Sequence, residues 1–183
     1  MIRSAIQSAI LPVAALMTFA AGVTDAAANE RDRSFFRSVE GKWSGPGEIV
    51  AGKYKGTKFV CNFTGSTPDG KIGMALDGGC RVGMFTQKMN AKIAREGRRG
   101  YRGSFMDGAE GKGLDVIGGS VSGNKVVFAL NRKALDGTMQ ARLPDDNTMT
   151  VTVSVKVEDQ LVPVIGMNLK RLDSKAVSAI ARE

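Results

Sequence analysis

The sequence predicts a mostly β protein, built as a single antiparallel β-barrel with short N- and C-terminal helices. Three observations support this class. About nine or ten short segments have strand composition, tight turns separate them, and glycines recur inside them. A closed barrel is favoured over a sandwich because closure hides the strand edges that a secreted monomer must protect.

The N-terminal segment has the pattern of a cleaved secretory signal. Arg3 precedes an apolar run over 9–23, and small residues ending at Ala28 follow. We therefore expect residues 1–28 to be removed and 29–183 to form one soluble domain in the periplasm. The alternative is an uncleaved anchor helix, but the run is short for a bilayer span, which needs about 20 apolar residues.

The first half of the mature chain predicts one helix and then strands. A helix is expected over 29–40, where Phe35, Phe36 and Val39 have helical spacing and Gly41 ends it. The strands that follow are expected at 43–51, 58–64, 72–76 and 80–84. The segment 87–96 is expected to be either a helix or a long mobile connection, because Met89 and Ile93 are four residues apart.

The second half predicts further strands and a closing helix. Glycine-punctuated or alternating strands are expected at 101–105, 114–119, 125–130, 137–143, 148–157 and 161–172. The segment 148–157 has the clearest pattern, with five apolar residues on one face and polar residues on the other. Asp173 or Ser174 is expected to cap a final helix that carries Val177 and Ile180.

Cys61 and Cys80 are the only cysteines in the chain. In an oxidising compartment an even pair predicts one disulfide, which would contribute roughly 3 kcal/mol by closing a loop of about 20 residues. The alternative is two buried free thiols.

The composition excludes several kinds of site. The chain has no histidine, which excludes Ser-His-Asp and Cys-His catalysis and the usual zinc sites. We therefore expect no enzyme, no cofactor and no metal. An enzyme would have to use other groups, of which Tyr101 and Asp107 are the first candidates.

The net charge is +8, and it stays at +8 after cleavage because the signal removes Arg3 and Asp25. A basic surface attracts anions. An exported protein rarely meets nucleic acid, so the expected partners are an anionic membrane surface or a glycan.

The triplet Gly41-Lys42-Trp43 follows a short predicted helix and opens the first strand. This start resembles that of the calycin superfamily, the lipocalin-like small β-barrels. The resemblance implies that Trp43 closes one end of the barrel and that Lys170 or Arg171, at the end of the last strand, packs across it. It also implies an interior that holds a small apolar ligand.

Apolar residues on the expected inner faces of the strands would line such a cavity, although residues of this kind more often fill a core. They are Phe59, Phe63, Met74, Met84, Phe105, Phe128, Met149 and Val151.

The densest positive charge is expected to bind an anionic lipid or glycan, as a lid or rim of the barrel. The alternative is a solvated basic loop. The residues are Lys88, Lys92, Arg95, Arg98, Arg99 and Arg102.

The leading hypothesis is a non-enzymatic exported barrel that binds an apolar or amphipathic envelope molecule, such as a lipid. The alternative is a periplasmic protein-interaction factor with no small ligand, which would act in envelope stability or as a protease inhibitor.

Overall fold

A computed structural model describes residues 22–106, 114–133 and 135–172 of the 183-residue chain. Within these ranges the chain forms one α-helix, ten strands and one 3₁₀ turn. In chain order they are α1 (Gly22–Val39), β1 (Gly41–Ile49), β2 (Lys58–Ser66), β3 (Gly73–Val82), β4 (Phe85–Arg95), η1 (Gly97–Arg99), β5 (Tyr101–Met106), β6 (Leu114–Ser122), β7 (Lys125–Arg132), β8 (Leu135–Asp145), β9 (Thr148–Val157) and β10 (Gln160–Arg171).

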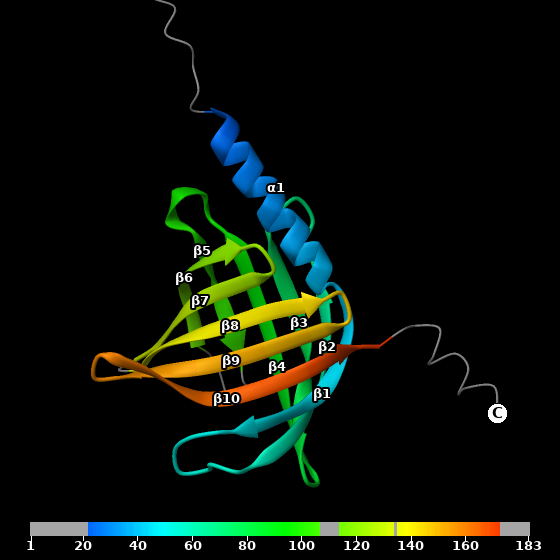
Figure 1. The fold of residues 1–183 in the computed structure, drawn as a ribbon, viewed down its shortest axis with the longest axis vertical. Coiled ribbons are helices and arrows are strands. Elements are labelled where there is room, and N and C mark those ends of the chain that lie inside the picture. The colour runs from blue at the N-terminus through cyan, green and yellow to red at the C-terminus, as the bar shows by residue number, and fades with distance from the viewer. Residues whose placement is uncertain (1–21, 107–113, 134, 173–183) are drawn as a thin grey trace, which may run out of the picture.

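The ten strands form one closed antiparallel barrel (Figure 1). Each strand pairs with the next along the chain, and β10 pairs with β1 to close the sheet. The predicted mostly β barrel is therefore confirmed. The predicted C-terminal helix at 173–183 lies outside the described residues.

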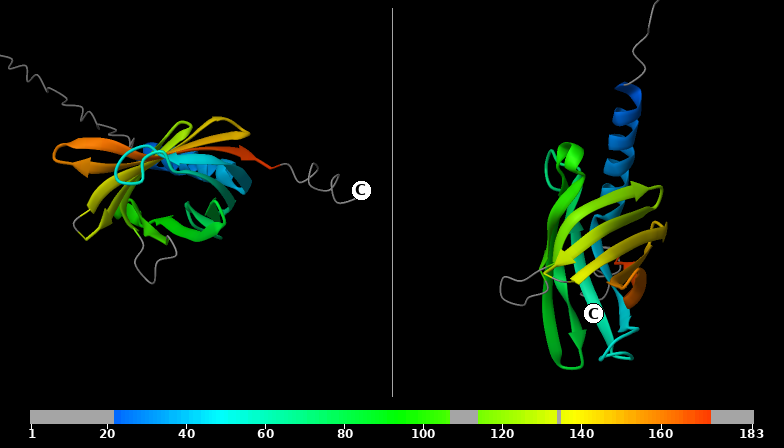
Figure 2. Two further views of the ribbon diagram at one scale, coloured as in Figure 1. Left: turned by 90° about the horizontal axis from the view of Figure 1, so that it is seen from below. Right: turned by 90° about the vertical axis from the view of Figure 1, so that its left-hand side faces the viewer.

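The helix α1 covers one end of the barrel, and its N-terminal part extends beyond the strands (Figures 1 and 2). Phe35, Phe36 and Val39, the residues that predicted this helix, are all buried against the barrel. The helix starts at Gly22, earlier than predicted, inside the expected signal. Among the described residues, no helix combines the length and the apolar character that crossing a bilayer requires.

The expectation of a helix or a mobile connection over 87–96 is wrong. Strand β4 covers this segment and pairs with β3 from Phe85 to Ala94. Met89, Ala91 and Ile93 face the interior, and the residues between them face outward. Apolar residues four apart fit a strand as well as a helix, because four is a multiple of the strand period of two.

The predicted disulfide between Cys61 and Cys80 is confirmed. The two residues lie directly opposite each other on β2 and β3, and both side chains are buried in the barrel. Their sulfurs contact the interior methionines, with Cys80 Sγ 3.4 Å from Met89 Sδ and Cys61 Sγ 3.8 Å from Met167 Sδ. The bond therefore links two neighbouring strands and forms part of the inner wall.

Candidate functional site

The end of the barrel under α1 is closed by a stacked tryptophan and arginine. Trp43 is fully buried, and its indole Nε1 donates a 2.8 Å hydrogen bond to the carbonyl oxygen of Val39. The Arg171 guanidinium lies 4.2 Å from the Trp43 ring centroid. The same guanidinium donates to the carbonyl oxygens of Ser38 and Asp146 at 2.7 and 2.8 Å. Arg171 thus joins the end of α1, the first strand and the β8–β9 turn.

Of the two basic residues that the resemblance offered for this position, Arg171 occupies it. Lys170 faces the outside of the barrel and donates a 2.6 Å hydrogen bond to the Thr148 hydroxyl. Neighbouring residues of a strand point to opposite faces, so only one of the two can reach Trp43.

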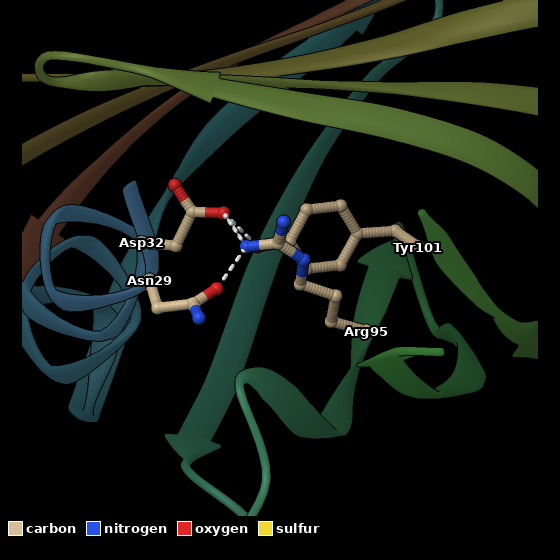
Figure 3. A network of polar contacts seen from close by, with 4 residues as sticks. All are labelled: Asn29, Asp32, Arg95 and Tyr101. Atoms are coloured by element: carbon tan, nitrogen blue, oxygen red, sulfur yellow. Dashed lines mark hydrogen bonds and ion pairs between the residues drawn. The ribbon is translucent and has the colours of Figure 1, made fainter. Parts of the chain in front are cut away.

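A partly buried polar network holds α1 on the barrel (Figure 3). The Tyr101 hydroxyl donates a 2.6 Å hydrogen bond to Oδ2 of Asp32, which the Arg95 guanidinium approaches to 3.4 Å. Arg95 also donates to Oδ1 of Asn29 at 2.5 Å. Asp32 is only 7% exposed and Tyr101 only 2%. The carboxylate is therefore paired with both a hydroxyl and a guanidinium, as a buried charge requires.

This environment raises the pKa of the Tyr101 hydroxyl well above its ordinary value. Burial is the largest cause, followed by the hydrogen bond to Asp32 and the negative charge of that carboxylate, while Arg95 acts in the opposite direction. The ring also packs between Phe36 and Phe128, with centroid distances of 5.4 and 5.7 Å. Tyr101 is thus a protonated, enclosed tether between the barrel and the helix.

The arrangement gives Tyr101 no access to a substrate, because its hydroxyl is committed to Asp32 and closed off by aromatic rings. Asp107, the other residue considered for an enzyme, lies outside the described residues. Within the described ranges, no group of three or more His, Cys, Asp or Glu side chains is arranged to hold a metal ion.

The interior contains two apolar cavities of unequal size. The inner cavity, directly under α1, has a volume of about 50 Å³ and is therefore largely filled by side chains. The outer cavity, toward the opposite end of the barrel, has a volume of about 250 Å³. Phe105, Met139 and Met167 line both cavities and separate them.

The outer cavity has an almost wholly apolar wall and reaches the solvent. Its wall consists of Ile49, Phe59, Cys80, Val82, Gln87, Met89, Phe105, Leu114, Leu130, Met139, Val153, Ile165 and Met167. Val82, which is 42% exposed, and the exposed Gln87 lie at its mouth. The barrel is therefore closed at the α1 end and open, with an apolar interior, at the other.

Seven of the eight residues predicted to line a cavity do so, but most of them surround the small inner one. The inner wall contains Phe63, Met74, Phe128, Met149 and Val151, while Phe59 lies at the outer cavity and Phe105 at both. These five inner residues mainly fill the core.

The prediction that Met84 faces inward is wrong, because its side chain is 93% exposed. Strand β3 ends at Val82, and Gly83 turns the chain with a φ of 59°. A positive φ of this size favours glycine and marks a tight turn. Met84 therefore lies at the tip of the β3–β4 hairpin instead of continuing the strand.

The six basic residues expected at the barrel rim do not lie together there. Strand β4 runs the full length of the barrel, so Lys88 lies near the open end while Arg95, Arg99 and Arg102 lie near α1. Lys92 is exposed on the outer face between these two ends. The side chain of Arg98 is outside the described part of the structure.

Two of these arginines have local partners. Arg99 forms an exposed ion pair with Glu96 at 3.2 Å, and Arg102 donates to the carbonyl oxygen of Tyr101 at 2.9 Å. Segment 88–102 therefore does not lie at the rim as a whole. Of its basic residues whose side chains are described, only Lys88 is near the open end.

Sequence reasoning missed most of the outer wall, including Met89, Leu130, Met139, Ile165 and Met167. One signal for it was present. Met149, Val151 and Val153 occupy every second position of β9 and share its inner face, so the inward apolar pattern continues toward the open end.

Comparison with known proteins gives no assignment: no protein-family model matches the sequence, and no curated protein is significantly similar to it.

Proposed function

We propose that this protein is a non-enzymatic, exported, lipocalin-like barrel that binds a single-chain amphipathic molecule of the cell envelope. The apolar chain would lie in the outer cavity and the polar head would remain at the open end. The observation that carries this proposal is the apolar cavity of about 250 Å³ that is open at one end and closed by α1 at the other.

The volume selects the kind of ligand. Pockets for small molecules usually measure about 300–1,000 Å³, so this cavity, at about 250 Å³, is slightly smaller than that range. One unbranched acyl chain suits such a space better than a large ring system. Met139 and Met167 at its inner boundary are flexible side chains, and their movement would extend the cavity toward α1.

The energetics give a measurable signature. Each buried methylene contributes about 0.8 kcal/mol, which corresponds to about a fourfold gain in affinity. Affinity for saturated fatty acids should therefore rise about fourfold per methylene and level off once the chain fills the cavity. Isothermal titration calorimetry over a range of chain lengths, below their micelle concentrations, measures this slope.

A pair of variants on β9 tests whether the dependence of affinity on chain length arises from the outer cavity. Val153→Phe adds volume to the outer wall and should move the plateau to shorter chains. Thr152→Phe places the same side chain on the opposite face of the strand and should leave the profile unchanged. Affinity that does not depend on chain length, or an equal effect of both variants, would contradict the proposal. A protein partner recovered by cross-linking would then favour the interaction-factor alternative.

The family relationship and the export belong to the same proposal. The stacking of Arg171 on Trp43, next to Gly41 at the start of β1, supports a lipocalin-like barrel. The signal pattern and the disulfide support export to the periplasm. After cell fractionation the protein should be found in the periplasm with Asn29 as its first residue. A chain that starts at Met1 would contradict the cleavage, and recovery from the cytoplasm alone would contradict the export.

A further inference from the structure

Two neighbouring hairpins project from the open end of the barrel, away from α1 (Figures 1 and 2). One is the β1–β2 connection over 50–57 and the other is the β3–β4 turn at 83–84. Strands β2 and β3 lie side by side and are joined by the disulfide, so the two hairpins are attached to one rigid part of the wall.

Large apolar side chains are concentrated on these two hairpins. Met84 is 93% exposed, Phe85 80% and Tyr54 62%. Of the eleven large apolar side chains that are exposed in the described part of the chain, six belong to the segments 50–60 and 81–88. Exposed apolar residues that gather in this way usually mark a contact surface.

The same two segments carry only positive charge. They contain five basic residues and no Asp or Glu. The basic residues, all exposed, are Lys53, Lys55, Lys58, Arg81 and Lys88.

The charge differs at another hairpin of the open end, the β9–β10 turn. It carries Glu158 and Asp159, and Lys156 pairs with the latter at 3.8 Å. The purely basic character is therefore a property of the two neighbouring hairpins and not of the whole end.

We infer that the two hairpins, together with the adjoining strand ends (segments 50–60 and 81–88), form a docking face for an anionic lipid bilayer. Aromatic and apolar tips enter the interfacial region of a bilayer, and lysines with long apolar stems keep their charge at the headgroups. Lys53 Nζ lies 5.5 Å from the Tyr54 ring centroid, so one aromatic tip already carries a cation beside it. The combination of protruding apolar tips with exposed lysines and arginine, and no acidic residue within these two segments, matches an anionic bilayer interface and favours it over a protein partner.

This docking would place the mouth of the outer cavity at the lipid surface, because Val82 and Gln87 of the second hairpin lie at that mouth. The inference goes beyond ligand binding and does not depend on it. A barrel that bound no ligand would still dock through these residues.

Vesicle co-sedimentation of the mature protein tests the inference. The vesicles contain either phosphatidylcholine alone or phosphatidylcholine with phosphatidylglycerol. We expect binding to the anionic vesicles that weakens as salt is raised. Lys53→Ser with Lys55→Ser should weaken it about fivefold per lysine at low salt. Met84→Ser with Phe85→Ser should weaken it at least tenfold.

Matched control pairs lie away from this face. Lys92→Ser with Arg99→Ser removes two exposed charges from the side and the α1 end of the barrel. Ile117→Ser with Leu172→Ser removes two exposed apolar side chains from other positions. Both controls should leave vesicle affinity within about twofold of the parent, and thermal unfolding should show that every variant keeps its fold.

Three results would overturn the inference. Equal losses in the hairpin variants and the charge controls would show attraction by net charge alone. Binding that the Met84 and Phe85 substitutions leave unchanged would show that the tips do not enter the bilayer. If the hairpin variants bound vesicles as well as the parent protein but lost binding to a soluble polyanionic glycan, the face would be assigned to a glycan instead.

Discussion

Tyr101 makes the closed end of the barrel testable through pH. The hydroxyl is buried, donates to Asp32 and has a raised pKa. A tyrosine with a raised pKa in the folded state stabilises that state fully below its unfolded pKa of about 10. The contribution is lost as the pH rises toward the folded pKa, because the unfolded chain then releases a proton that the folded chain retains. The free energy of unfolding should therefore decrease above about pH 10.

The size of this effect follows from linkage. The free energy of unfolding should decrease by roughly 1.4 kcal/mol by pH 11 through Tyr101 alone. Tyr101→Phe removes this decrease. At neutral pH the same substitution should cost about 1.5–3 kcal/mol, because it removes a hydrogen bond to a buried charged group.

The chain suits this experiment because it has only two tyrosines, and Tyr54 is exposed on a hairpin. In a Tyr54→Phe background, the near-ultraviolet absorbance of phenolate reports on Tyr101 alone. Urea unfolding between pH 8 and about pH 11 then compares this variant with Tyr54→Phe/Tyr101→Phe, so the titration of lysines cancels between the two.

Two outcomes would refute the reasoning. One is phenolate absorbance that develops near pH 10 while the protein remains folded, since this requires an accessible hydroxyl. The other is equal pH dependence of unfolding in the two variants, which would mean that Tyr101 does not link the helix to the barrel.

The remaining predictions concern the disulfide and the contact between Arg171 and Trp43. Cys61→Ala with Cys80→Ala should lower the free energy of unfolding by roughly 3 kcal/mol, measured by urea denaturation; a loss below about 1 kcal/mol would contradict the structural role of the disulfide. Arg171→Met should cost about 2–4 kcal/mol, because it removes the guanidinium stacked on Trp43 and its hydrogen bonds to carbonyl oxygens. Arg171→Lys should recover only part of this loss, since an ammonium lacks the planar fork, and full recovery would show that charge alone is sufficient.

The strands were largely predictable from the sequence because their signal is local. In β9 the alternation of Met149, Val151 and Val153 with polar residues is complete within ten residues. The disulfide also followed from counting, since two cysteines allow one pairing. Arg171 was predicted only as one of two residues, because choosing between neighbours requires the register of β1 on β10.

The features that sequence reasoning missed depend on contacts between distant residues. Asp32 and Tyr101 are separated by 69 residues, and neither position alone indicates a tether. The outer cavity exists because α1 closes only one end of the barrel. No local sequence pattern indicates which end remains open. The basic residues of 88–102 looked like one cluster because they are close in sequence, whereas an extended strand places its two ends far apart.

The most direct test of the central claim is mass spectrometry of the protein purified from the cells that produce it naturally, under native and then denaturing conditions. We expect the native protein to carry one additional mass, which is released on denaturation and belongs to a single-chain amphipathic molecule. Val153→Phe should carry less of it, and Thr152→Phe should carry as much as the parent protein. A native mass equal to that of the bare polypeptide, in a protein that also takes up no fatty acid in calorimetry, would contradict ligand binding in the outer cavity.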